Sequence, residues 1–133
     1  MTPFRAAAVA TMLALGGCLA TTNPQSPGNL EGVIFEDLPA APGMALEKPG
    51  YGHKSPSGSV RDYTQHYSGS RRLEDTKRWY EETFALHPHD WKLVSSEGTS
   101  PATLVFEKRA EKVTVTLQNV GSLLKVVVHV SGK

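Results

Sequence analysis

The stretch from Ala102 to Val130, ATLVFEKRAEKVTVTLQNVGSLLKVVVHV, decides the fold that the sequence predicts. Apolar and polar residues alternate in three runs within it, separated by short polar or glycine-containing turns. A period of two is typical of a β-strand with one buried face, because successive side chains point to opposite faces of a sheet. Strands joined by such short turns pair in antiparallel fashion.

Upstream of this stretch, the pattern predicts one more strand and a helix. Residues 91–96 form an expected strand that ends at the polar turn 97–101. Before it, apolar residues recur at helical spacing between Ser70, the expected helix cap, and Pro88, which cannot continue a helix. The apolar stripe of this helix consists of Leu73, Thr76, Tyr80 and Phe84, widened by Trp79 and Thr83.

A fifth strand is expected over residues 60–67, where Tyr63, Gln65 and Tyr67 share one face. The predicted fold class is therefore α+β, with one helix packed on a mostly antiparallel sheet of about five strands. The order along the chain is strand, helix and four strands. We expect a single domain over 33–133 with an irregular segment at 37–59, because proline and glycine interrupt any long element there. The apolar cluster 33–35 is expected to form a short strand.

The composition fits one ordinary folded domain. The 133 residues are 39% hydrophobic and 20% charged, and Lys+Arg 14 against Asp+Glu 13 gives a net charge of +1. A chain so close to neutrality lacks the basic face that a nucleic-acid-binding protein uses, so nucleic acid is not an expected partner.

The amino terminus has the layout of a secretory leader. A short positive start, Met1–Arg5, precedes the uncharged apolar run Ala6–Leu15. This run is too short to cross a membrane, which takes about 20 apolar residues. We therefore expect residues 1–17 to be a signal peptide. Residues 18–32, rich in Thr, Asn, Pro, Ser and Gly, are expected to be a flexible tether.

The apolar run ends in Leu15-Gly16-Gly17-Cys18, and Cys18 is the single cysteine of the chain. This motif resembles the lipobox of bacterial lipoproteins. The resemblance implies cleavage between Gly17 and Cys18, a diacylglycerol on the Cys18 sulfur, and an acyl chain such as palmitate on the freed amine. Two or more acyl chains hold a protein stably on a bilayer. The alternative is that Cys18 ends an ordinary leader or is a small buried apolar residue.

By resemblance to enterobacterial sorting, Leu19 in place of aspartate after the cysteine favours the outer membrane, with the protein facing the periplasm. The domain also has a resemblance of its own. Its features are Tyr67-Ser68-Gly69 before the helix, Trp79-Tyr80 within it, Trp91 after it, and a strand that contains Phe106-Glu107-Lys108. This order resembles a group of small bacterial lipoproteins of unknown function. Asp90 stands where that group commonly has glycine, and the resemblance implies no catalytic residues.

The densest group of metal-ligating residue types is His87, His89 and Asp90. Residues two apart in an extended segment can point the same way, so the two histidines could share a metal with Asp90. Zinc sites usually need three or four ligands, and no further ligand stands at a recognisable spacing. A polar loop between helix and strand is the simpler interpretation, and we expect no metal and no cofactor.

Four aromatic residues, Tyr63, Tyr67, Trp79 and Trp91, are candidates for a binding surface. The alternative is that they form the core between helix and sheet. Serines at 57, 59, 68 and 70 lack the Gly-x-Ser-x-Gly frame of a nucleophile elbow, so we expect no catalytic residues and no enzyme.

These observations favour a membrane-anchored envelope lipoprotein without catalytic activity. We expect it to bind another protein or an envelope polymer through a sheet face or edge strand that one helix leaves open. The alternative is a periplasmic module that binds a metal or a small molecule, either at the histidine loop or between helix and sheet. A hydrolase is the least favoured function.

Overall fold

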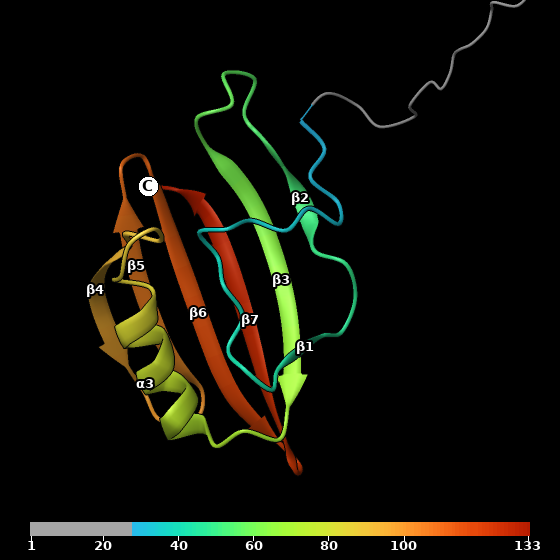
Figure 1. The fold of residues 1–133 in the computed structure, drawn as a ribbon, viewed down its shortest axis with the longest axis vertical. Helices are drawn as coiled ribbons and strands as arrows, with labels where there is room; N and C mark the ends of the chain where they lie inside the picture. Colours follow the sequence, from blue (N-terminus) through green and yellow to red (C-terminus); the bar gives the residue numbers. More distant parts are fainter. Residues whose placement is uncertain (1–27) are drawn as a thin grey trace, which may run out of the picture.

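A computed structural model of the chain describes residues 28–133. The expected signal peptide, the lipidation site Cys18 and most of the expected tether lie outside the described residues. Within them, one antiparallel sheet carries one helix, which confirms the α+β class (Figure 1). The elements are β1 (Ala45–Leu46), β2 (Tyr51–Lys54), β3 (Arg61–Gly69), α3 (Leu73–Thr83), β4 (Lys92–Glu97), β5 (Ala102–Lys108), β6 (Glu111–Val120) and β7 (Leu123–Gly132).

The sheet has seven strands rather than the expected five. Its order is β1-β3-β7-β6-β5-β4, and β2 pairs with β3 on the same side as β1. The two additional strands, β1 and β2, lie inside the 37–59 segment, which was expected to be irregular. Both are short and mostly exposed, so neither carries the apolar alternation of a half-buried strand. Pairing with β3, and not their own pattern, makes them strands.

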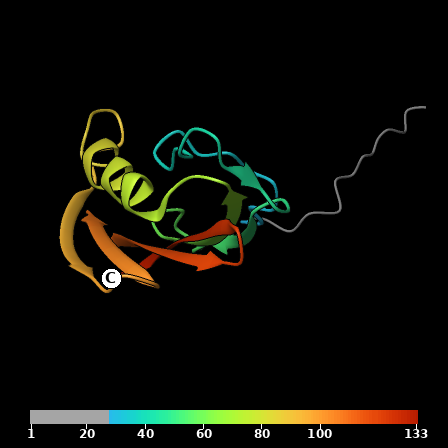
Figure 2. The same ribbon diagram turned by 90° about the horizontal axis from the view of Figure 1, so that it is seen from below.

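The two faces of the sheet are in different surroundings. Helix α3 and the segment that precedes β3 both lie over one face, here called the inner face, as Figure 2 shows. The strands alternate buried and half-buried residues along β3, β5, β6 and β7. Side chains of the inner face form the core with α3. Its largest fully buried members are Trp91, Tyr63, Tyr80, Phe84, Phe106, Leu104, Leu117 and Leu124.

Helix α3 starts two residues later than a cap at Ser70 would place it. Arg72 is the N-cap residue and makes no side-chain capping hydrogen bond. The Thr76 hydroxyl instead donates to the Arg72 carbonyl at 2.8 Å, one turn into the helix. The charged pairs on the solvent side are Asp75 with Arg78 and Lys77 with Glu81. The buried stripe of Leu73, Thr76, Tyr80 and Phe84 confirms the helical periodicity.

The segment 28–50, here called the N-terminal segment, packs on the domain. Leu30, Leu38 and Ala41 are buried in the core. The Leu30 amide donates to Gly52 at 2.9 Å and the Gly32 amide donates to Gly50 at 2.8 Å. The described end of the expected tether therefore lies against the edge of β2.

The short strand expected at 33–35 does not form. These residues have irregular backbone, and Ile34 is 71% exposed. Among residues 28–133, no helix is both long and apolar enough to cross a membrane.

Candidate functional site

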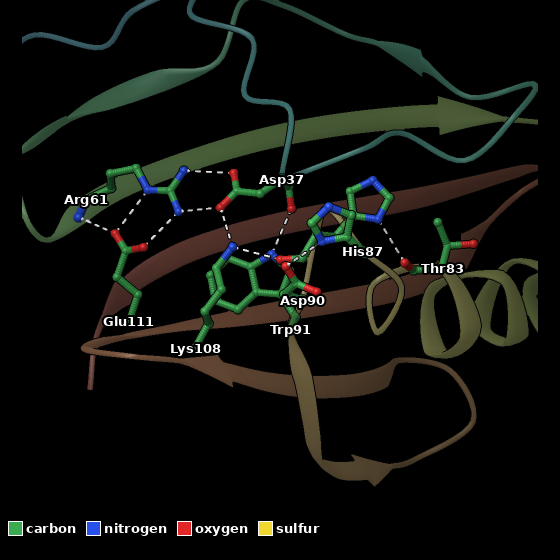
Figure 3. A network of polar contacts seen from close by, with 9 residues as sticks. Asp37, Arg61, Thr83, His87, Asp90, Trp91, Lys108 and Glu111 are labelled. Atoms are coloured by element: carbon green, nitrogen blue, oxygen red, sulfur yellow. Dashed lines mark hydrogen bonds and ion pairs between the residues drawn. The ribbon is translucent and has the colours of Figure 1, made fainter.

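The most extensive polar network of the described residues lies at one end of the inner face (Figure 3). Arg61, at the start of β3, donates to both carboxylate oxygens of Asp37 at 3.0 and 2.9 Å. It also donates to both oxygens of Glu111, the first residue of β6, through its guanidinium at 3.0 and 2.7 Å. The Arg61 backbone amide adds a bond of 2.7 Å to the same carboxylate. Two bidentate pairs fix the guanidinium in one orientation.

Lys108, at the end of β5, continues the network. Its ammonium donates to Asp37 Oδ2 at 2.8 Å and to the His89 carbonyl at 2.7 Å. It also lies 4.4 Å from the centre of the Trp91 ring, within the range of a cation–π contact. The Trp91 indole donates to the Asp37 carbonyl at 2.7 Å. We call Asp37, Arg61, Trp91, Lys108 and Glu111 the Arg61 cluster.

The charges of the Arg61 cluster balance, because Arg61 and Lys108 face Asp37 and Glu111. Burial alone would raise the pKa of Asp37, but the hydrogen bonds and charges of Arg61 and Lys108 outweigh it and hold the pKa below its ordinary value. Burial would lower the pKa of Arg61, but its bonds to Glu111 and Asp37 raise it further above its already high value. Every charged side chain in the cluster is therefore paired with an opposite charge.

A cluster of this kind fastens segments together and leaves no reactive group free. A general base or nucleophile needs an unpaired atom facing a space where substrate can lie. Here the polar atoms connect the N-terminal segment to β3, β5 and β6. Sequence analysis did not single out this network, since residues that bond to one another in it are up to 71 positions apart. The one available signal was Phe106-Glu107-Lys108, whose lysine is a member.

The histidine loop does not bring its three candidate ligands together. His87 Nδ1 lies 3.3 Å from Asp90 Oδ2, and the His87 side chain is 88% exposed. His89 Nδ1 instead donates to the Thr83 carbonyl at 2.9 Å, at the end of α3. Among residues 28–133, no three His, Cys, Asp or Glu side chains are arranged to hold a metal ion. Asp90 adopts a left-handed backbone with φ 61°, which explains why glycine would suit this position.

The four aromatic candidates do not form an exposed surface. Tyr63, Tyr67 and Trp91 are buried on the inner face, and Trp79 is half-buried with its ring edge-on to Tyr80 at 5.0 Å. Their rings fill the space between helix, N-terminal segment and sheet, where large apolar area is removed from water. The core interpretation of these residues is thus the one that fits.

Two open hollows accompany the fold. One, of about 430 Å³, is lined by Gly28, Lys54, Ser55 and Pro56. The other, of about 330 Å³, lies at the start of α3, beside the turn after β4 and the end of β6. Neither lining includes a histidine or an aromatic residue. Neither therefore offers a histidine base or an aromatic stacking platform for a ligand.

The face of the sheet opposite α3, here called the outer face, is a broad exposed feature of the described chain (Figure 2). Its central rows follow from the strand register. One row contains Thr64, His129, Thr114, Val105 and Ser95, and the next contains His66, Val127, Thr116, Thr103 and Glu97.

Two polar pairs lie on the part of the outer face formed by β3 and β7. His129 Nε2 lies 2.9 Å from Asp62 Oδ1, and Lys125 forms an ion pair with Glu47. Tyr51 stacks on His66, with ring centres 5.9 Å apart. The centre of the face is made of small threonine and valine side chains, and the charges lie around it.

No family model, curated protein or solved structure matches the chain.

Proposed function

We propose that this chain is a lipid-anchored envelope protein without catalytic activity, whose domain binds another protein or an envelope polymer through the outer face. The observation that carries the proposal is that the sheet is covered on one side only. Helix α3 and the N-terminal segment lie over the inner face, and no described residue lies over the outer one (Figure 2).

The composition of the outer face supports this function. Val105 and Val127 lie among threonines at its centre, and all are half-buried. Ion pairs stand around them. Many protein interfaces have a core depleted of charge and a polar rim, which this arrangement resembles. The strands hold these side chains on a rigid framework, so binding would cost little ordering of the surface.

The interior of the domain supports the non-catalytic part of the proposal. Its largest polar network, the Arg61 cluster, uses its charges on one another. It joins segments far apart in the chain, which is a structural role.

The membrane location is proposed from the sequence. Leu15-Gly16-Gly17-Cys18 resembles a lipobox, and lipid on Cys18 would hold the domain at a membrane surface. Leu19 favours the outer membrane, facing the periplasm.

A Cys18→Ser variant tests the anchor. We expect the chain with Cys18 to remain with membranes after a high-salt wash and to incorporate labelled palmitate. The Cys18→Ser variant should lose both properties. The matched control is Ser26→Ala, which leaves the motif intact. A Cys18→Ser chain that is still cut before residue 18 and still pelleted with membranes would contradict the anchor.

A photo-reactive amino acid at Thr116 tests the outer face. It should cross-link a defined partner in intact cells, whereas the same group at Glu82, on the exposed side of α3, should not. A second outer-face position, Val127, should give the same product. Equal yields from Thr116 and Glu82 would exclude the outer face as the binding surface without bearing on the anchor.

A further inference from the structure

Strand β4 forms one edge of the sheet. It pairs with β5 on one side, and among residues 28–133 no strand pairs with its other side (Figure 1). Leu93 and Val94 are 37% and 45% exposed there, although both are large and apolar. Proteins usually protect such an edge with proline, with lysine or with a covering loop, because its free amides and carbonyls can pair with another chain. Strand β4 contains no proline, and its one lysine, Lys92, stands at the end of the strand.

The pairing of β4 with β5 contains a bulge. Lys92 stands opposite Glu107 and Leu93 opposite Phe106, but the next pair is Ser95 with Val105. Val94 is therefore the extra residue of the bulge. The inserted residue changes which side chains share a face.

The bulge brings two opposite charges onto one face. In a regular strand, residues five positions apart point to opposite faces. Here Lys92, Ser95 and Glu97 all stand opposite outer-face residues of β5, namely Glu107, Val105 and Thr103. Leu93 and Ser96 stand opposite the inner-face residues Phe106 and Leu104. The strand thus has a positive residue at one end of its outer side, a negative one at the other, and Ser95 midway.

We propose that β4 pairs in antiparallel fashion with β4 of a second copy of this chain, about a twofold axis at Ser95. In this register Val94 stays the extra residue of each strand, so that Lys92 of each copy lies opposite Glu97 of the other, Leu93 opposite Ser96, and Ser95 opposite Ser95. The strand is complementary to itself in charge, which is the property that a twofold interface requires. Because the bulge is present in both copies, the two edges have the same local twist.

The pairing joins two sheets into one continuous sheet. The free backbone groups of both edges gain partners, and the exposed Leu93 and Val94 gain cover. A parallel arrangement of the two strands would place Lys92 beside Lys92 and Glu97 beside Glu97, and like charges directly opposite one another disfavour it. The charges therefore select the antiparallel dimer.

Charge reversal provides the first test. The full-length chain is purified in detergent in a Cys18→Ser background, so that acyl chains cannot gather the copies, and dimerisation is measured by analytical ultracentrifugation at low salt. Lys92→Glu alone and Glu97→Lys alone should each weaken dimerisation about tenfold, since each puts two like-charged pairs in the interface. The double variant Lys92→Glu/Glu97→Lys restores opposite charges and should dimerise within about threefold of the parent.

A disulfide test reports the register directly. Directly opposite residues in an antiparallel pair have Cα atoms about 4.5–5.5 Å apart, within the span of a disulfide. In the Cys18→Ser background, Ser95→Cys should form a cross-linked dimer under mild oxidation. Ser59→Cys, in an exposed turn far from β4 in sequence, controls for random collision and should not.

Either test can overturn the proposed dimer. A chain that is monomeric at every concentration reached overturns it, as does a double variant no better than the single ones. Equal cross-linking of Ser95→Cys and Ser59→Cys overturns the register. Because the anchor is absent from these samples, failure here would leave the proposed function untouched.

Discussion

Arg61 donates to both carboxylate oxygens of Asp37, a residue 24 positions earlier in the chain, at 3.0 and 2.9 Å. This pair fastens the N-terminal segment to the sheet, because Asp37 belongs to the former and Arg61 begins β3. The Trp91 indole and the Lys108 ammonium hold the same residue from the other side. Asp37 is thus the point where three parts of the fold meet.

Asp37→Asn should destabilise the domain by about 1–3 kcal/mol, since it leaves two largely buried cations with one acceptor fewer and one countercharge fewer. The measurement is the free energy of unfolding in urea. Asp75→Asn, which removes an exposed pair with Arg78 on α3, is the matched control and should change stability by less than about 0.5 kcal/mol. Equal effects of the two substitutions would show that the Arg61 cluster is not a stabilising centre.

The Asp37 contribution should depend on pH. The folded state lowers the pKa of this carboxyl from its ordinary 3.8, so the contribution is complete above that value and is lost as the pH falls through the folded pKa. The stability difference between the unmodified chain and Asp37→Asn should therefore be constant near neutrality and shrink below about pH 4. Trp91 fluorescence in a Trp79→Phe background follows the transition. A difference that stays constant into strong acid would contradict the lowered pKa.

Gly52→Ala should detach β2 from β3. A Cβ at this position would lie 2.0 Å from the Asp62 carbonyl oxygen, and φ is +146°, where residues with side chains are strained. Leu30 and Lys54 donate their amides to Gly52 and Gly28, between the N-terminal segment and the other side of β2. Hydrogen exchange at these two amides should become faster, because a β2 displaced from β3 no longer holds that segment. Gly58→Ala also changes a glycine with positive φ, at +80°, but meets no atom within 4 Å. It should leave those two amides protected, and a similar loss in both variants would refute the steric explanation.

Neighbouring residues on β6 should lose different amounts of stability when methyl and hydroxyl groups are exchanged. Val115 is fully buried on the inner face, so Val115→Thr should cost about 1–3 kcal/mol through an unpaired hydroxyl. Thr114 lies on the outer face, so Thr114→Val should change stability by less than about 0.5 kcal/mol. Thermal unfolding of the two variants checks this difference. A large loss for Thr114→Val would mean that the outer face is not free in the isolated chain.

The part of the fold that the sequence predicts is the part with local patterns. Strands β5, β6 and β7 alternate apolar and polar residues, and Leu73, Thr76 and Tyr80 recur at helical spacing, because each of these elements has one buried side. Tyr63 and Tyr67 follow the same logic on β3. Their burial explains why their alternation with polar residues predicts a strand, and also why they do not form a binding surface.

Features that depend on contacts between distant parts of the chain could not be predicted from the sequence. Strand β2 exists because its residues pair with β3, and its own four residues show no period. Glu111 bonds to Arg61, which is 50 positions away, and no local sequence pattern around either residue predicts this pair. The expectation that Ser70 caps the helix was wrong, because the helix begins at Leu73 and its N-cap residue is Arg72. The bulge at Val94 could not be predicted either, because one extra residue in a six-residue strand leaves its composition unchanged.

The order of the strands also constrains when the sheet can form. Strand β3 comes before α3 in the sequence, yet the strand that connects it to the rest of the sheet is β7, the last of the described strands. Without Leu123–Gly132, β3 can pair with β1 and β2 but has no connection to β6. The inner face therefore becomes continuous only when β7 joins β3 to β6, and residues 28–122 alone would leave the core in two separate parts.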